Sequence, residues 1–195
     1  AEIKKQVGII KKTYGPTTVL GARRTTIGKP PVPVSVDLQQ AMIEKEPLTL
    51  ICSAKGWIRS MKGHGLNTAE LKYKEGDREQ FILEGQSTDK ILIYASNGRF
   101  YTLPADKLPS GRGFGEPVRL LVEIPNDADI TSMMIWQPDQ RLLLASRDGR
   151  GFIVPSSEIL AQTRNGKQVM TVEDNADAVF FAVIEPHHDY VAVIG

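Results

Sequence analysis

The chain has 195 residues, of which 41% are hydrophobic and 24% are charged, with a formal net charge of +1. These proportions are those of an ordinary globular protein with one core or two small ones, and no apolar run approaches the roughly 20 residues of a bilayer span. The near-neutral total hides a segregation of charge, because residues 1–30 carry seven Lys or Arg and one acid, whereas residues 121–140 carry acids alone.

The single cysteine, Cys52, lies inside an apolar run. One cysteine excludes an internal disulfide and a zinc knuckle, and it favours a reducing compartment. We expect Cys52 to be a small buried core residue. Because the first residue is not Met and no signal peptide heads the chain, we expect a piece of a longer protein.

Residues 1–45 are predicted to hold the end of a helix that belongs to a neighbour absent from the chain, followed by a basic, proline-rich linker. Ile3, Val7 and Ile10 recur at helical spacing with lysines between them. From residue 14 to residue 36 the composition turns to Pro, Gly, Thr and Arg, which favours extended backbone. A short amphipathic helix is expected over 37–44.

From residue 46 onward short apolar runs alternate with Gly and Pro, which predicts an all-β domain over 46–195. Two segments of it repeat, LIYASNGRFYTLP at 92–104 and LLLASRDGRGFIVP at 142–155. The same register continues to Gly115 and Gly166, and then to Val118 and Val169. Offsets preserved over this length indicate an internal repeat.

An earlier copy, LICSAKGWI at 50–58, supplies a third turn glycine. The glycines at 56, 98 and 149 are 42 and 51 residues apart, which is within the range of propeller blades. Asn97-Gly98 and Asp148-Gly149 suit the positive φ of tight hairpin turns. We therefore predict stacked hairpin repeats over about 46–88, 89–138 and 139–187, with the start of another at 188–195, where YVAVIG occurs.

A loop rich in glycine and cations follows each hairpin: RSMKGHGLN at 59–67, PSGRGFGEPV at 109–118 and QTRNGKQV at 162–169. Glycine lets backbone amides approach an anion, and Arg or Lys adds charge and hydrogen-bond donors. Cations repeated once per blade along one edge suit a long polyanion such as duplex DNA. The predicted contact residues are Lys55, Arg59, Lys62, Arg99, Arg112, Arg147, Arg150, Arg164 and Lys167.

Two other classes of function are weighed against DNA binding. A propeller-like protein-interaction module would dock through the acidic segments around Asp127 and Glu173, with the basic loops merely solvated. A small-molecule enzyme is disfavoured, because no nucleophile, acid and base can be named. His187 and His188 lack a partner at zinc spacing, and EDNAD at 173–177 lacks the glycine and terminal Glu of a calcium loop. No catalytic residue, metal ligand or cofactor is therefore assigned within the chain.

Several stretches resemble the C-terminal region of the bacterial topoisomerase IV A protein (ParC type), a family related to the gyrase A protein. They are EPLTLICSAKGWIRSMKGHGLN at 46–67, LPSGRGFGEPVRLLVEIP at 108–125 and KQVMTV at 167–172, and the resemblance spans 46–195. It implies a β-pinwheel of repeated four-stranded blades that binds DNA on a basic outer edge. The gyrase box Gln-Arg-Arg-Gly-Gly-Lys-Gly does not occur, and QTRNGKQ at 162–168 is only a degenerate echo of it, which favours topoisomerase IV over gyrase.

The resemblance also implies a role and partners. The domain would bind or bend a DNA segment and steer the substrate preference of an ATP-dependent type IIA topoisomerase, in relaxation and decatenation during chromosome segregation. The implied partners are double-stranded DNA, the dimer of the parent protein and the topoisomerase IV B protein, with no small-molecule substrate and the fragment itself a monomer. Mg²⁺ and ATP are implied for other parts of that enzyme only, and the implied location is the bacterial cytoplasm, on the nucleoid.

Overall fold

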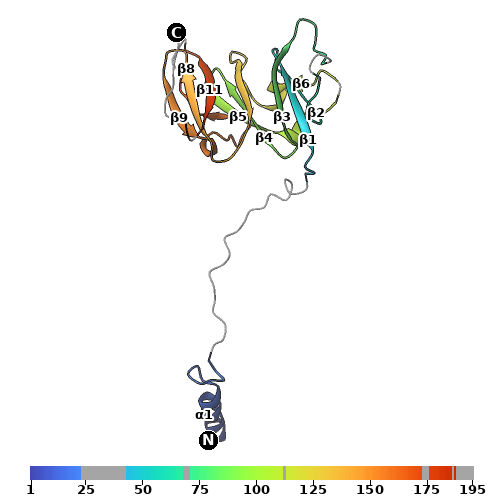
Figure 1. Cartoon of the computed structure of the whole chain (residues 1–195). Coiled ribbons are helices and arrows are strands. Elements are labelled where there is room, and N and C mark those ends of the chain that lie inside the picture. Colours follow the sequence, from blue (N-terminus) through green and yellow to red (C-terminus); the bar gives the residue numbers. More distant parts are fainter. Residues whose placement is uncertain (23–42, 68–70, 112, 173–175, 186, 188–195) are drawn as a thin grey trace. The chain divides into compact units, whose positions relative to one another are not determined.

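The computed structural model describes residues 1–22, 43–67, 71–111, 113–172, 176–185 and 187 (Figure 1). The chain divides into two compact units, residues 1–37 and residues 38–195. The short helix expected over 37–44 and the repeat start YVAVIG fall almost wholly outside the described residues.

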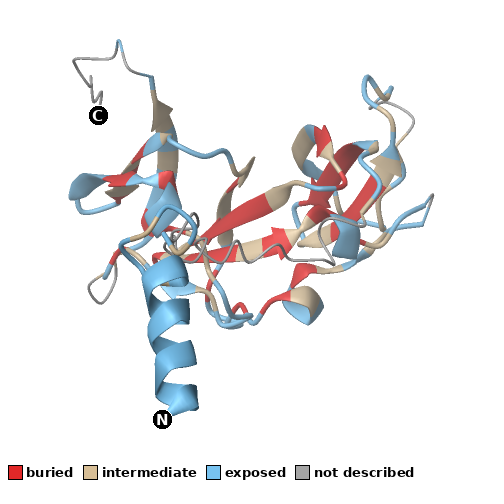
Figure 2. Cartoon of the chain, turned by 90° about the horizontal axis from the view of Figure 1, so that it is seen from below, coloured by how far each residue is buried: buried red, intermediate tan, exposed pale blue. Residues whose placement is uncertain are grey.

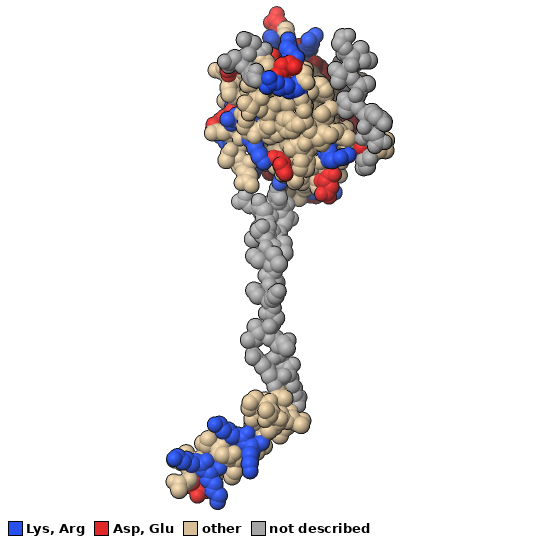
Figure 3. Space-filling model, turned by 90° about the vertical axis from the view of Figure 1, so that its left-hand side faces the viewer, with Lys and Arg blue, Asp and Glu red and all other residues tan. Residues whose placement is uncertain are grey.

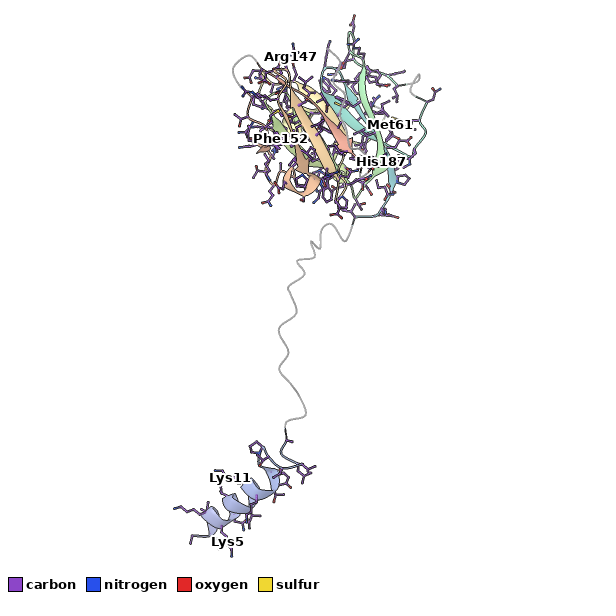
Figure 4. All side chains as sticks on the ribbon, turned by 60° about the vertical axis from the view of Figure 1, so that its left-hand side comes forward. Lys5, Lys11, Met61, Arg147, Phe152 and His187 are labelled. Atoms are coloured by element: carbon purple, nitrogen blue, oxygen red, sulfur yellow. The ribbon has the colours of Figure 1, made fainter. Side chains whose placement is uncertain are left out.

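The first unit holds helix α1 (Glu2–Tyr14), which confirms the helix predicted from the spacing of Ile3, Val7 and Ile10. No residue of this helix is buried. Lys5 and Lys11 project from it (Figure 4), and its lysines form the basic surface of this unit in Figure 3.

The second unit contains three antiparallel sheets, each built around one of the predicted hairpins (Figure 1). Blade 1 has the strand order β3-β1-β2-β6 and blade 2 the order β10-β5-β4-β7, while blade 3 shows β11-β8-β9 within the described residues. The all-β pinwheel predicted from the sequence is confirmed. The strands are β1 (Pro47–Ser53), β2 (Trp57–Lys62), β3 (Glu79–Gln86), β4 (Lys90–Ala95), β5 (Arg99–Pro104), β6 (Glu116–Pro117), β7 (Ile130–Ile135), β8 (Arg141–Ser146), β9 (Gly151–Pro155), β10 (Lys167–Gln168) and β11 (Ala178–Ile184).

The outermost strand of each four-stranded blade comes from a later part of the chain. Strand β6 follows the hairpin of blade 2 but pairs with β2 of blade 1. In the same way β10 follows the hairpin of blade 3 but pairs with β5 of blade 2. Neighbouring blades are therefore joined by backbone hydrogen bonds as well as by packing.

The predicted turn glycines occupy equivalent places in the three hairpins. Gly56, Gly98 and Gly149 have φ of 75°, 74° and 81°, a region that strains any residue with a Cβ. Each of them donates its amide to the carbonyl three residues earlier, at 2.9, 2.9 and 3.1 Å. The three hairpins thus use the same tight turn, which is why the sequence spacing of these glycines revealed the repeat.

Two cores lie between successive blades, since alternate side chains of a strand point to opposite faces of its sheet (Figure 2). We call the face turned toward the preceding repeat the front face and the opposite one the back face. The first core joins the back face of blade 1 to the front face of blade 2, and the second joins blade 2 to blade 3 in the same way. The first contains Leu50, Cys52 and Ile58 with Ile91, Ile93 and Tyr101, and the second contains Leu92, Tyr94 and Phe100 with Leu142 and Leu144.

The back face of blade 3 stays open within the described residues. Ile153 is 52% exposed and Phe180 44% exposed. This side of the domain is largely uncharged in Figure 3, with Lys, Arg, Asp and Glu gathered around its margin.

Candidate nucleic-acid interface

Two of the predicted cationic loops, 109–118 and 162–169, contain β6 and β10, which we call the swapped strands because each pairs with the preceding blade. A similar backbone contact anchors both loops. After β6, the amide of Val118 donates to the carbonyl of Gly56 at 2.8 Å. After β10, the amides of Val169 and Met170 donate to the carbonyl of Gly98 at 3.2 and 3.0 Å. The repeated spacing from each loop glycine to Val118 or Val169 thus reflects one way of docking a loop onto the outer edge of the preceding blade.

Three predicted contact residues belong to the β5–β10 edge of blade 2. In β10, Lys167 lies opposite Phe100 of β5 and Gln168 lies opposite Arg99, so strand alternation places the side chains of Lys167 and Arg99 on opposite faces of this edge. Nη1 of Arg99 donates to the carbonyl of Asn165 at 2.9 Å, the residue that follows Arg164 in the sequence. We call Arg99, Arg164 and Lys167 the blade 2 basic cluster. Within the described part of the chain, none of the three is ion-paired with a carboxylate.

The side chain of Arg164 is fixed by the end of a short helix, α3 (Val118–Leu121). Its Nε donates to the carbonyl of Leu121 at 3.1 Å, and its Nη2 donates to the carbonyl of Leu120. Carbonyls at a helix C-terminus lack partners within the helix, and a cation is favoured there. Arg164 is still exposed, so it is both anchored and accessible to an anion.

At blade 1, Lys55 is exposed in the hairpin turn and contacts the segment 71–78. Its Nζ donates to the carbonyl of Glu75 at 3.3 Å, and its backbone amide donates to Oδ1 of Asp77 at 3.0 Å. Partial burial acts to raise the pKa of Asp77, but hydrogen bonds from Ser53 and from the amides of Arg78 and Lys55 outweigh it, so that the pKa lies below its ordinary value. Asp77 therefore stays ionised and offsets part of the charge of Lys55.

Sequence reasoning missed two cations of this same segment, Lys72 and Lys74. The Nζ atom of Lys74 lies 3.2 Å from the ring centroid of Trp57, a cation–π contact. Both lysines belong to LKYKEGD at 71–77, where a lysine on either side of a tyrosine was the available signal.

Arg59 differs from the other predicted contact residues because it is only 4% exposed. Its Nη1 donates to the carbonyl of Gly113, and its Nη2 donates to the carbonyl of Lys72 at 3.0 Å. Strand alternation places Arg59 on the front face of blade 1, beneath these two loops, so the prediction that it belongs to a solvent-facing loop was wrong. We therefore remove Arg59 from the proposed contact residues.

The remaining predicted cations are exposed but lie next to carboxylates. Nζ of Lys62 is 2.9 Å from Glu46, Nε of Arg147 is 3.9 Å from Asp177, and Nε of Arg150 is 3.1 Å from Asp148. The hydrogen bond to Glu46 raises the pKa of Lys62, and the hydroxyl of Ser146, with the charge of Arg150, lowers the pKa of Asp148. Exposed pairs of this kind are weak, because water screens both charges, so a phosphate could compete for these cations.

The predicted residues therefore do not all gather in one place. Arg99, Arg164 and Lys167 belong to one edge of blade 2, while Lys55 lies at the turn of blade 1 and Lys62 at the far end of β2. Arg147 and Arg150 flank the turn of blade 3, where Arg147 is visible in Figure 4, and Arg112 falls outside the described residues. A common basic edge that includes all of them stays a prediction.

The described residues contain neither a grouped set of metal-ligating side chains nor an exposed thiol. Among them, no three His, Cys, Asp or Glu side chains are grouped so as to hold a metal ion. Cys52 is buried, as predicted, and burial, with a smaller effect from the charge of Asp77, raises the pKa of its thiol to about 12. A thiol with this pKa is a core residue rather than a nucleophile. No helix in the described ranges has the length and apolar character of a membrane span.

Comparison with known proteins places the fold in a family. A model of the DNA gyrase C-terminal domain, a beta-propeller, matches residues 89–137 and 140–184. The A protein of DNA topoisomerase 4 from Rickettsia conorii is 48% identical over 193 residues, which is 99% of this chain and 26% of that protein. The corresponding protein of Caulobacter vibrioides is 43% identical over 180 residues, which is 92% of this chain and 23% of that protein.

Two solved structures agree. The ParC C-terminal domain of E. coli aligns with a TM-score of 0.68 at 37% identity and covers 72% of this chain and 57% of that one. A second C-terminal domain of DNA topoisomerase IV aligns with a TM-score of 0.64 at 17% identity, covering 73% of this chain and 47% of that one, which supports the fold alone.

The swapped blades define a β-pinwheel of the gyrase C-terminal type. The chain belongs to the family of C-terminal domains of the bacterial topoisomerase IV A protein (ParC type), so the resemblance seen in the sequence is confirmed. The chain spans about a quarter of the length of the curated relatives that it matches.

Proposed function

We propose that this domain binds duplex DNA through phosphate contacts at the outer edges of its blades and so guides a DNA segment for a type IIA topoisomerase. The observation that supports this most directly is the blade 2 basic cluster. Pairing of β10 with β5 brings the segment that carries Arg164 and Lys167 to the edge that carries Arg99, although these residues are far apart in the sequence.

The geometry of the cluster suits a phosphate backbone. A duplex carries one negative charge per ~1.7 Å of its axis, and neighbouring strands lie about 4.8 Å apart. Cations on two neighbouring strands therefore meet more than one phosphate at a time. Contacts of this kind position DNA without reading bases, so binding is expected to be independent of sequence and to allow the duplex to bend around successive blades.

The properties of the whole enzyme follow as part of the proposal. The parent would be an ATP-dependent enzyme that relaxes and decatenates DNA in chromosome segregation, on the bacterial nucleoid, as a dimer that assembles with the topoisomerase IV B protein. Mg²⁺ and ATP would be held elsewhere in that assembly, and we assign no residue of this chain to them.

The proposal is tested by measuring duplex affinity as a function of salt. Log affinity should fall with log salt, and Arg99→Gln or Lys167→Gln should each reduce the slope by about 0.9, the value for one lost phosphate contact. Arg141→Gln is the matched control, because Arg141 is an exposed cation at the start of β8, outside the cluster. A wild-type slope near zero would remove the electrostatic basis of the proposal.

A second candidate, a protein-interaction module without DNA binding, is favoured by the exposed Ile153 and Phe180 on blade 3. It predicts no complex with nonspecific duplex in a band-shift assay at low salt. The DNA-binding proposal predicts a complex that disappears as salt rises.

A further inference from the structure

We infer that Arg59 is a positioning residue that joins the lysine-bearing segment 71–78 of blade 1 to a loop that arrives from blade 2, and so orders a DNA-binding edge without touching DNA itself. The inference rests on the proposed DNA-binding function. It concerns the loop 109–115, which arrives from blade 2, and the segment 71–78, which belongs to blade 1.

The ends of the loop 109–115 are attached to β2 by backbone contacts. At one end the amide of Ser60 donates to the carbonyl of Pro109 at 2.9 Å, and the amide of Gly111 donates to the carbonyl of Ser60 at 3.2 Å. At the other end Gly115 lies so close to β2 that an added Cβ would be 2.2 Å from the carbonyl oxygen of Ile58. Of the described residues between these two ends, Gly113 and Phe114 make no backbone hydrogen bond with β2.

Arg59 supplies the contact in the middle. One arm of its guanidinium donates to the carbonyl of Gly113 and the other to the carbonyl of Lys72, and the group lies 5.9 Å from the ring centroid of Tyr73. A single side chain thereby joins the two loops. In the sequence Gly113 is flanked by Arg112 and Phe114, and Lys72 is followed by Tyr73 and Lys74.

The chemistry of arginine is required for this arrangement. A planar guanidinium directs its donors along two fixed directions, whereas the ammonium of lysine is a single point from which both carbonyls cannot be reached in the same way. Within the described residues Arg59 has no carboxylate partner, so its buried charge is compensated by carbonyls and by the ring of Tyr73. Holding the loops in advance reduces the ordering cost when a phosphate backbone binds.

The position that Arg59 occupies in the repeat explains why its side chain can contact the two loops. By the spacing of the turn glycines, Arg59 corresponds to Tyr101 in blade 2, a fully buried residue of the core between blades 1 and 2. The front face of blade 1 meets no preceding blade within the described residues. Arg59 instead covers this face by contacting the two loops.

The test compares Arg59→Lys with Arg59→Gln by duplex affinity, salt slope and hydrogen exchange of the loop amides, at a temperature where circular dichroism shows both variants folded. Both variants should bind about tenfold more weakly, a loss of about 1.4 kcal/mol, and should exchange faster at 109–115 and 71–74. The loop 162–167, which arrives from blade 3 and docks on blade 2, is the internal control and should exchange as in the wild type.

The outcomes separate the alternatives. If Arg59 touched phosphate directly, Arg59→Lys would bind nearly as well as the wild type, which would overturn the inference. If Arg59 only stabilised the fold, melting would shift while affinity and loop exchange of the folded variants stayed unchanged, which would also overturn it. Failure of the wild type to bind duplex would defeat the proposed function instead, and loop exchange would still decide whether Arg59 holds the loops.

Discussion

Blade 1 and blade 3 each have one face that no other blade covers within the described residues, and the two faces differ. On the front face of blade 1, Ile51 is 1% exposed, and it lines a small hollow together with Tyr73, Lys74 and Phe114. On the back face of blade 3, Ile153 and Phe180 are 52% and 44% exposed. Each repeat has two apolar faces, so blade 1, which has no preceding blade within the described residues, needs other residues to cover its front face. The segment 71–78 between β2 and β3 and the loop that arrives from blade 2 cover it.

The largest effect that this comparison predicts is on stability. Ile51→Ala should lower the free energy of unfolding by about 3 kcal/mol, because it leaves a cavity under the cover of blade 1. Ile153→Ala, the matched change on the open face of blade 3, should lower it by only about 0.5 kcal/mol. Urea unfolding of the two variants measures both values.

A large loss in Ile153→Ala would contradict the comparison, because it would mean that the back face of blade 3 is covered in solution. Sedimentation analysis of the same samples would then show whether a second copy of the chain supplies that cover.

A smaller contrast is expected at the hairpin turns. An added Cβ at Gly98 would lie 2.0 Å from the carbonyl oxygen of Met170, which belongs to the swapped segment, whereas Gly149 has nothing within 4 Å among the described residues. Gly149→Ala should cost only the strain of its positive φ, about 1–2 kcal/mol. Gly98→Ala should cost about 3 kcal/mol or more, because the swapped segment must also move. Equal losses in the two variants would show that the swapped segment does not dock on Gly98 in solution.

The smallest effect concerns the chemical reactivity of the Cys52 thiol. With its pKa raised to about 12 by burial, Cys52 should not react with iodoacetamide at pH 8 until the protein unfolds. By the repeat spacing, Ala145 is the corresponding residue on the open face of blade 3, where it is only partly buried. In the Cys52→Ala, Ala145→Cys double variant the new thiol should react while the protein is folded, as followed by mass spectrometry. Rapid labelling of native Cys52 would show that blades 1 and 2 separate readily.

Much of the fold could be predicted because it depends on the conformational preferences of single residues and their near neighbours. Gly56, Gly98 and Gly149 sit where positive φ is needed, so their spacing reported the repeat directly. The burial of Cys52 followed from the apolar run around it. The site was predicted less well, because the sequence near a turn does not show where a strand ends and a loop begins. Arg59 was assigned to an exposed loop for this reason, although it is a buried residue of β2.

The sequence by itself determined the hairpin repeat and its turns, because turn conformation depends on a residue and its near neighbours. Only the tertiary structure decided that β6 and β10 return to the preceding blade, that Arg99 shares an edge with Arg164 and Lys167, and that Arg59 lies beneath two loops. These outcomes depend on pairings between segments that are distant in the chain. Backbone hydrogen bonds form between residues of almost any type, so the sequence does not reveal which segments pair.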